Sequence, residues 1–382
     1  MKSSRIKGFH GLSVSDRREA ALGKIETEDN SLLTDGGLSL SQAQLLVENI
    51  IGVFGLPLAL APNFLIDDQE WFIPMVTEEP SVVAAASNGA RIAREGGGFH
   101  VTSSDSVTTC RILLQTPSPH KSREQIRSMR SHLLTQLGEK DPLLLSLGGG
   151  PVDLQCDEFS REQTLSLSLH VRCLDAMGAN IVNTMGEQLV TLLHEAGVGR
   201  GLGSIITNGM PQRETTVTAH FPLLLLGRSN MTGNEAAGRI CALAQWAIDD
   251  PYRAVTHNKG IMNGVTAVTL ATGNDTRAQE AAAHFHAARS GKYSPLSIWQ
   301  IIGDDLVGTC KMPCAVGTVG GMTALHPTVK LLFSRMGIKT ARTLEALMVS
   351  TGLANNFAAL WAIATEGIQR GHMALHAQRQ KK

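Results

Sequence analysis

The middle of the chain constrains the fold most, because its hydrophobic pattern differs from that on either side. Residues 110–115 and 165–173 alternate in polarity as strands do, the second of them reading LSLSLHVRC. Residues 122–137 and 176–196 have the apolar spacing of amphipathic helices. Strand, helix, strand and helix in so short a stretch predict a compact α+β unit.

Longer helical patterns occur on both sides of this unit. An Ala-rich helix is expected over 81–94, with Pro80 at its first position and the Gly96–Gly98 run after its end. Further helices are expected over 235–248, 277–290, 341–350 and from 356 onward. The sequence therefore predicts an α+β fold in which the middle unit is inserted into a mainly helical large domain.

The charge balance argues against several kinds of partner. Lys plus Arg and Asp plus Glu both number 34, and aromatic residues make up only 4% of the 382 residues. Neutral charge gives no reason to expect nucleic acid or an anionic membrane, and base-stacking surfaces are not expected. Six scattered cysteines and no apolar leader at the N-terminus indicate reduced thiols in the cytoplasm.

One apolar stretch, residues 49–66, is long enough to raise the question of a membrane span. Pro57, Pro62 and Asn63 interrupt it, and a spanning segment must satisfy every backbone polar group internally. A buried loop or core segment is the better interpretation.

No common dinucleotide motif is present. The GVGRGL run at 197–202 ends in Leu and follows a helix, so a flexible turn is expected there. The run DAMGAN at 175–180 lies at an expected helix start, where free N–H groups and small side chains suit a pyrophosphate. A plain Asp N-cap followed by small residues explains the same pattern.

Three polar residues stand in positions suited to chemistry. Lys259 lies between Asn258 and Gly260, where we expect a turn that aims its ammonium at a developing oxyanion. Asp275 precedes a helix, and Glu79 precedes Pro80. To donate a proton, Glu79 would need burial or a neighbouring carboxylate such as Asp275. A solvated lysine, an N-cap and a first-turn acid are the alternatives.

Metal binding is not expected. His372 and His376 have helical i, i+4 spacing without an H-E-x-x-H pattern, and Cys310 and Cys314 have no second pair. A histidine in this last segment titrates in a range that suits a proton donor.

Ordered blocks along nearly the whole chain resemble those of 3-hydroxy-3-methylglutaryl-CoA (HMG-CoA) reductases, specifically the bacterial second class. The blocks are EEPSVVAAAS (78–87), SLGGG (146–150), DAMGANIVNTM (175–185), DPYRAVTHNKGIMNG (250–264), ATGND (271–275) and ATEGIQRGHMALH (364–376). The resemblance implies that HMG-CoA and mevalonate plus CoA are interconverted by two hydride transfers with a nicotinamide cofactor.

The resemblance also implies roles for individual residues. Glu79 matches a proton donor to the reduced carbonyl, and Lys259 matches the lysine that stabilises the oxyanion. Asp275 matches the aspartate that couples them, and His372 matches the acid that protonates the departing thiolate. The positions that match substrate-binding residues are Ser81, Arg253 and Asn263, with Asn208 a weaker candidate.

The middle unit then resembles the family's small ferredoxin-like nucleotide-binding domain, which is not a Rossmann fold. The implied domains are 1–106 and 208–371 for the large domain, 107–207 for the insertion, and 372–382 for the start of a C-terminal flap. We expect NADH to be preferred over NADPH, because an acid before SLGGG would repel a 2′-phosphate. The expected cofactor-binding residues are Asp141, Asp175, Met177, Gly178, Ala179 and Asn180.

The resemblance implies a cytoplasmic homodimer with an active site at the subunit interface, and dimers that assemble into a hexamer. Three features depart from the family pattern: Met322 replaces a small residue, Asn355 replaces a Gln, and 10 residues follow His372 where relatives have a longer flap. They favour one alternative, a catalytically weakened homologue that binds CoA esters; if the chain ends here, we expect weaker catalysis with binding largely kept. Another thioester enzyme with a covalent cysteine is a second alternative, but no cysteine stands in such a motif.

Overall fold

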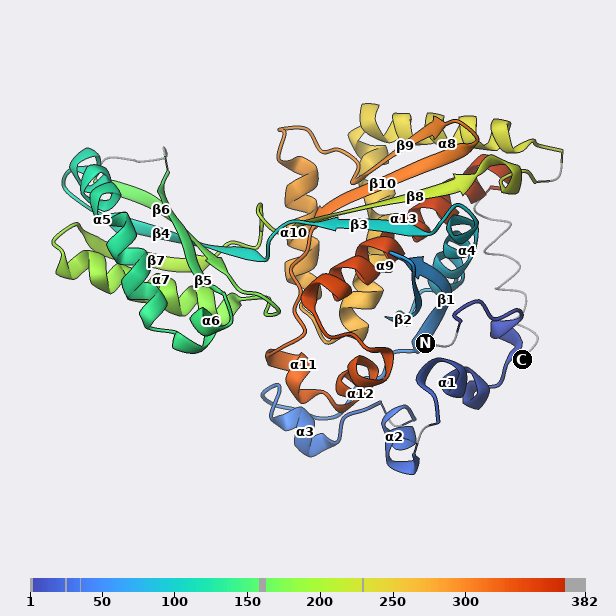
Figure 1. The fold of residues 1–382 in the computed structure, drawn as a ribbon, viewed down its shortest axis with the longest axis horizontal. Coiled ribbons are helices and arrows are strands. Elements are labelled where there is room, and N and C mark those ends of the chain that lie inside the picture. Colours follow the sequence, from blue (N-terminus) through green and yellow to red (C-terminus); the bar gives the residue numbers. More distant parts are fainter. Residues whose placement is uncertain (1–2, 25, 35, 158–162, 229, 368–382) are drawn as a thin grey trace. The chain divides into compact units, whose positions relative to one another are not determined.

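The computed structural model describes residues 3–24, 26–34, 36–157, 163–228 and 230–367 (Figure 1). The chain divides into a large unit, residues 1–103 and 215–382, and a small unit, residues 104–214. The small unit begins three residues before the expected insertion and ends seven residues after it, so Asn208 falls in the small unit rather than the large one. The predicted α+β class is confirmed.

A six-stranded mixed sheet lies at the centre of the large unit, in the order β2-β1-β3-β8-β10-β9. Residues 71–76 have a strand-like pattern in the sequence and lie in β2, whereas the other five strands were not predicted. The strands are β1 (Leu58–Ile66), β2 (Gln69–Val76), β3 (Phe99–Ser103), β8 (Glu214–Pro222), β9 (Ser297–Ile302) and β10 (Asp305–Pro313).

Helices account for most of the rest of this unit. Those before the insertion are η1 (Phe9–Gly11), α1 (Val14–Leu22), α2 (Thr27–Leu32), α3 (Leu40–Gln44) and α4 (Val82–Glu95). Those after it are η2 (Leu223–Leu225), α8 (Gly233–Asp249), α9 (Pro251–Ala271), α10 (Thr276–Ala288), α11 (Gly321–Leu325), α12 (Pro327–Met336) and α13 (Ala341–Thr365).

The apolar stretch over 49–66 is only partly buried, contrary to expectation. Its second half forms β1, in which Pro62 and Asn63 make a bulge between the residues paired with β2. Its first half is exposed, with Ile51 fully accessible and Phe54 90% accessible. A strand with a bulge tolerates the prolines that argued against a membrane-spanning helix.

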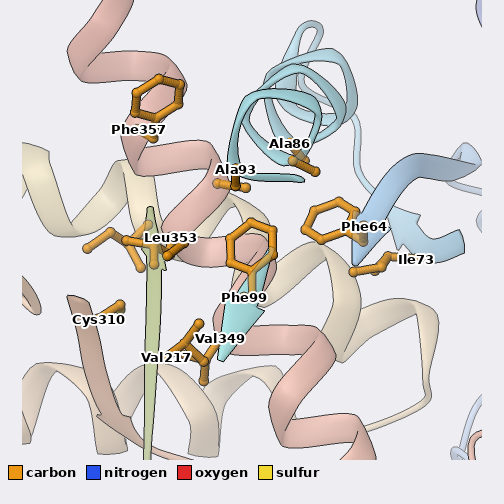
Figure 2. Packing of buried hydrophobic residues seen from close by; sticks show 14 of the residues in the cluster. Phe64, Ile73, Ala86, Ala93, Phe99, Val217, Cys310, Val349, Leu353 and Phe357 are labelled. Carbon is orange, nitrogen blue, oxygen red and sulfur yellow. The ribbon is translucent and has the colours of Figure 1, made fainter. Parts of the chain in front are cut away.

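Helix α13 is the core element of the large unit. It packs against α4, α8, α9 and β10, and its apolar side chains fill the space between helices and sheet (Figure 2). Among the described residues it is the one helix apolar and long enough to cross a membrane, but 78% of its most apolar window is buried inside the protein. Its apolar character is therefore explained by its central place.

The small unit is a four-stranded antiparallel sheet in the order β5-β6-β4-β7. Along the chain, strand, helix, two strands, helix and strand give the order of a ferredoxin-like split βαβ unit. Leu165, Leu167 and Leu169 point from β6 into its core. The elements are β4 (Val107–Gln115), α5 (Pro119–Glu139), α6 (Pro142–Ser146), β5 (Gly150–Cys156), β6 (Thr164–Arg172), α7 (Ala179–Glu195) and β7 (Arg200–Ile206).

Candidate functional site

An ion pair joins two residues that lie 180 positions apart in the chain. Lys259 Nζ donates to Glu79 Oε2 over 2.7 Å. The two side chains are 59% and 37% exposed, respectively. Because exposed pairs contribute about 0–1 kcal/mol to stability, the fold does not need this contact. An accessible carboxylate beside an accessible ammonium is an arrangement that can handle protons and charge at a bound ligand.

Lys259 lies on a helix, not on the turn expected from its glycine and asparagine neighbours. Helix α9 begins with Pro251 at its first position and Asp250 as N-cap, and it continues to Ala271. This segment contains glycine but stays helical because Gly264 packs closely against α13. A Cβ there would lie 2.8 Å from Thr351 O, so glycine permits the close approach of α9 to α13. Tertiary packing thus outweighs the low helix propensity of glycine.

Glu79 lies in the turn between β2 and α4. Its backbone N–H donates to Thr77 Oγ1 over 3.1 Å. Helix α4 begins at Val82, so Pro80 lies before the helix rather than at its first position. The reason is Ser81, whose left-handed backbone, with φ of 77°, separates the turn from the helix. Such a conformation in a non-glycine residue costs on the order of 1 kcal/mol and is typical of binding sites.

Ser81 has a second unusual feature. Its Oγ is buried and has no hydrogen-bond partner among the described residues. The side chain also lines a cavity of about 1600 Å³ in the large unit. A buried hydroxyl without a partner among the described residues, in a residue that lines a cavity, is a candidate for contact with a ligand.

The lining of this cavity is basic and apolar. Among the residues that the structure describes, it contains Arg5, Lys7, Arg17, Arg18 and Arg91, and no Asp or Glu. Residues 53–60 supply a large share of the apolar lining, and leucines at positions 22, 32, 33 and 38 add to it. The cavity therefore combines a surface for an uncharged chain with cations for phosphate or carboxylate groups.

Asp275 is placed differently from expectation. It is the N-cap of α10 and accepts from the N–H groups of Arg277 and Ala278, each over 3.0 Å. It forms an ion pair with Arg277, 3.6 Å away, and no hydrogen bond or ion pair joins it to Glu79 or Lys259 among the described residues. Glu79 and Lys259 therefore contact each other directly, while Asp275 takes the N-cap position that was its alternative, and its coupling role stays a prediction.

The two substrate-binding candidates on α9 lie on different faces. Asn263 is one turn after Lys259, on the same partly exposed side of the helix. Arg253 is half-buried, and its guanidinium lies 5.8 Å from the centre of the Trp246 ring. Burial lowers the pKa of this guanidinium from its usual range.

Sequence reasoning missed a buried network behind this helix. His257 is 2% exposed, and its Nε2 lies 2.6 Å from Ser297 Oγ and 3.2 Å from Asn356 Nδ2. Asn258, fully buried, accepts from the N–H of Leu296 over 2.8 Å. The network ties α9 to β9 and α13. Its signal in the sequence was the polar run before Lys259, which was taken for a turn.

The state of His257 predicts a pH dependence. Burial, with a smaller effect from the Arg253 charge, lowers its pKa from 6.5 to about 3. The unfolded chain therefore binds a proton that the folded chain excludes, so stability is lost as pH falls from 6.5 towards 3. The contribution amounts to about 3 kcal/mol between pH 7 and pH 4. Thermal unfolding at these two pH values should show a smaller difference for His257→Gln than for the wild type; an equal difference would contradict this assignment.

In the small unit, the segment 175–180 lies at a helix N-terminus, three residues later than expected. Helix α7 begins at Ala179 after Gly178, whose φ is 101°, so Asp175 is not the N-cap. A Cβ on Gly178 would lie 2.5 Å from Cys173 Sγ, which explains the need for glycine. Arg213, 1% exposed, donates to the carbonyl of Ala176 over 2.9 Å and holds the turn.

Asp141 lies near the same end of the small sheet. Its side chain is the N-cap of α6 and accepts from the N–H of Leu144 over 3.0 Å. The following strand pairs Gly150 with Arg172, which leads into the segment 175–180. Asp141, Asp175, Met177, Gly178, Ala179 and Asn180 are thus all in the small unit. Asn208, an exposed turn residue after β7, also lies in it.

The remaining predictions concern His372, metal binding and the two substitutions that depart from the family pattern. His372 and the flap lie outside the described residues. No group of histidine, cysteine or acidic residues that could hold a metal ion occurs among the residues that the structure describes. Met322 is 38% exposed, so it does not crowd the core, whereas Asn355 is 4% exposed where α13 meets α9.

Comparisons with known proteins agree with this arrangement. The family model for hydroxymethylglutaryl-coenzyme A reductase matches residues 13–377. A 3-hydroxy-3-methylglutaryl-coenzyme A reductase from Archaeoglobus fulgidus is 42% identical over 98% of this chain and 86% of its own. A probable reductase from Borreliella burgdorferi is 34% identical over 87% of this chain and 77% of its own.

Solved structures give the same result. The reductase of Streptococcus pneumoniae is 39% identical with a TM-score of 0.90, covering 98% of this chain and 90% of its own. A class II structure of that enzyme bound to NADPH in open conformations is 38% identical with a TM-score of 0.88, covering 94% of this chain and 99% of its own. The resemblance found in the sequence is confirmed, and the chain belongs to the hydroxymethylglutaryl-coenzyme A reductase family of oxidoreductases.

Proposed function

We propose that the chain interconverts HMG-CoA and mevalonate plus CoA by two successive hydride transfers. The observation that carries the proposal is the exposed Glu79–Lys259 pair. Two residues after Glu79, the Ser81 hydroxyl has no hydrogen-bond partner among the described residues. In the reductive direction, the thioester carbonyl receives one hydride and CoA leaves as the thiol. The resulting aldehyde receives the second hydride and a proton to give the alcohol.

Each residue has a role that its chemistry can support. Lys259 stabilises the negative charge that develops on the carbonyl oxygen, and Glu79 returns a proton to that oxygen. His372 protonates the departing thiolate, and Asp275 couples Glu79 to Lys259 in the assembled site. Ser81, Arg253 and Asn263 bind the hydroxymethylglutaryl group, with the Arg253 guanidinium as the partner of its carboxylate.

The cavity lined by these basic side chains is the place we assign to the CoA part of the substrate. A long uncharged chain fits its apolar lining, and the phosphate groups of CoA fit Lys7, Arg17 and Arg18. Ser81 places one end of this cavity beside the Glu79 turn. The thioester would then lie at the ion pair while the nucleotide end lies among the cations.

The nicotinamide cofactor supplies the hydride when bound, and the small unit is where we place it. The N–H groups of Ala179 and Asn180 begin a 17-residue helix, where a pyrophosphate is favoured by the helix dipole. Gly178 leaves the backbone accessible beside them. These residues fit an anionic dinucleotide without a Rossmann motif.

We further propose that NADH is preferred over NADPH because Asp141 would repel a 2′-phosphate. Asp141→Asn removes the charge but keeps a residue that can cap α6. The ratio of kcat/KM for NADH to that for NADPH should fall by about tenfold or more, as expected for loss of one close charge. A wild-type preference for NADPH, or an unchanged ratio in the variant, would refute the role of Asp141.

We also propose a cytoplasmic homodimer with its active site at the subunit interface, and dimers that associate into a hexamer. The exposed apolar side chains of Leu45, Val47, Ile51 and Phe54 support a second copy of the chain as their partner. Light scattering with size-exclusion chromatography measures the assembly. A monomer at micromolar concentration would contradict this part of the proposal.

The activity itself is tested by following NADH oxidation on addition of HMG-CoA. Turnover with HMG-CoA and none with acetyl-CoA is the expected result. A weakened homologue, which the comparisons do not favour, would bind CoA esters without oxidising the cofactor. Absence of turnover with both cofactors and in both directions would reject the proposed reaction.

A further inference from the structure

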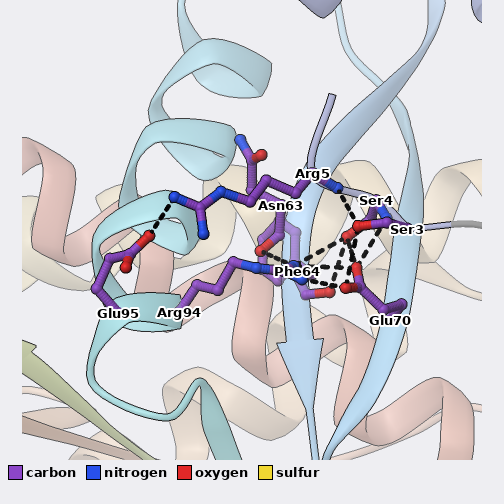
Figure 3. A network of polar contacts seen from close by, with 8 residues as sticks. All are labelled: Ser3, Ser4, Arg5, Asn63, Phe64, Glu70, Arg94 and Glu95. Atoms are coloured by element: carbon purple, nitrogen blue, oxygen red, sulfur yellow. Dashed lines mark hydrogen bonds and ion pairs between the residues drawn. The ribbon is translucent and has the colours of Figure 1, made fainter. Parts of the chain in front are cut away.

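A network of hydrogen bonds attaches the N-terminal segment to the large unit (Figure 3). Glu70 on β2 forms a forked ion pair with Arg94 on α4. The same carboxylate accepts from the backbone N–H of Ser4 over 2.7 Å and from the Ser4 hydroxyl. The Arg94 side chain is 12% exposed and the Glu70 side chain 24% exposed, unlike the exposed pair at Lys259. We call these three residues, Ser4, Glu70 and Arg94, the N-terminal clamp.

The clamp holds its carboxylate firmly in the charged form. Burial alone would raise the pKa of Glu70, but the hydrogen bonds from Arg94 and Ser4 and the charge of Arg94 lower it to about 2. The Ser4 carbonyl also accepts from the N–H of Asn63 over 3.1 Å, at the bulge of β1. Ser4 itself is fully buried. The chain is thus fixed at this point by backbone and side-chain contacts together.

A second anchor lies five residues further on. Phe9 is 7% exposed, and its ring lies 5.5 Å from that of Phe72 on β2. The residues between the two anchors, Arg5 to Gly8, line the basic cavity, and α1 with Arg17 and Arg18 follows. Lys7, Arg17 and Arg18 have no carboxylate partner within 4.0 Å among the described residues. The segment therefore presents cations to the cavity and depends on its anchors for its position.

We propose that the N-terminal clamp positions this cationic wall for the phosphate groups of a CoA thioester. The inference rests on the proposed function, since it assumes that the cavity takes the CoA part of the substrate. Glu70, Arg94 and Ser4 do not touch the substrate in this account and are positioning residues. With the wall held in place, less conformational freedom is lost when the phosphates bind, which favours affinity over turnover.

The test compares two thioesters in a clamp variant. Glu70→Gln removes the charge and keeps the shape of the side chain, and Arg94→Lys keeps the charge but loses the forked geometry. The substrates are HMG-CoA and the HMG thioester of N-acetylcysteamine, which lacks the nucleotide. We expect KM for HMG-CoA and Kd for free CoA to rise by about tenfold in both variants. For the short thioester, kcat and KM should stay within about twofold, because its binding does not use the wall.

The control is Glu124→Gln, which replaces an exposed glutamate in the small unit. It should leave kcat and KM for both thioesters and Kd for CoA unchanged. Circular dichroism and thermal unfolding show whether each variant is folded. If Glu70→Gln does not fold, Arg94→Lys provides the test instead. An unchanged Kd for CoA in a folded variant, or equal losses for both thioesters, would overturn the proposal. A wild-type protein that turns over neither thioester would reject the proposed function instead, and the Kd for CoA would still test the clamp.

Discussion

Replacing Lys259 by alanine is expected to lower kcat by about 10²–10³-fold, the usual effect of removing one donor to a developing oxyanion. Folding should be nearly unaffected, because the side chain is 59% exposed and its ion pair with Glu79 lies at the surface. Steady-state kinetics with HMG-CoA and a thermal unfolding curve measure both quantities. The combination of lost turnover and retained stability separates a chemical role from a structural one.

The control for this variant is Lys121→Ala, an exposed lysine on α5. It should leave kcat and the unfolding temperature unchanged. If Lys259→Ala kept wild-type kcat, the lysine would be the solvated surface residue that its exposure alone permits. The Glu79–Lys259 pair would then have no part in the reaction.

Replacing Gly89 by alanine is expected to destabilise the large unit by about 3 kcal/mol, as overpacking of a tight helix crossing does. Gly89 lies on α4, and a Cβ there would be 2.4 Å from the carbonyl oxygen of Ala354 on α13. That oxygen belongs to backbone, which cannot move without shifting the core helix. Chemical denaturation measured by circular dichroism gives the change in the free energy of unfolding.

Gly238→Ala on α8 is the matched control. A Cβ there meets no atom within 4 Å, so alanine should stabilise by about 0.5–1 kcal/mol through its better helix propensity. Opposite signs for the two substitutions are the expected result. Equal effects would mean that α4 and α13 do not approach as closely as the structure has them.

Sequence patterns predicted the elements whose local signals agree with their tertiary surroundings. The alternation in β6 and the three glycines after α4 both lie where expected. Helix α9 was taken for a turn because Gly260, Gly264 and the asparagines around Lys259 lower helix propensity. Contact with α13 makes the helix favourable, and a local pattern does not contain that information.

The long helix α13 shows the same limit. Residues 341–350 and the stretch from 356 were expected as separate helices, yet α13 is continuous from Ala341 to Thr365. Gly352 lies between them because a Cβ would come within 2.8 Å of Val265 on α9. The strands β9 and β10 were not predicted at all.

The candidate site was found mainly through the family blocks rather than through spacing. The blocks drew attention to Glu79 and Lys259, which the structure brings to 2.7 Å. For Asp275 the blocks imply a place beside that pair, whereas the local pattern left an N-cap as the alternative, and its side chain caps α10 in the structure. The buried network of His257 and the N-terminal clamp depend on contacts between distant segments, which no local motif encodes.

The central claim is that this chain reduces a CoA thioester to an alcohol at one site in two hydride steps. The most direct measurement is the stoichiometry of the reaction, with NADH oxidation followed by absorbance and the released thiol of CoA titrated in the same sample. We expect two molecules of cofactor to be oxidised for each CoA released, with mevalonate as the product. A ratio of one, with the aldehyde accumulating, or thiol release without cofactor oxidation, would contradict it.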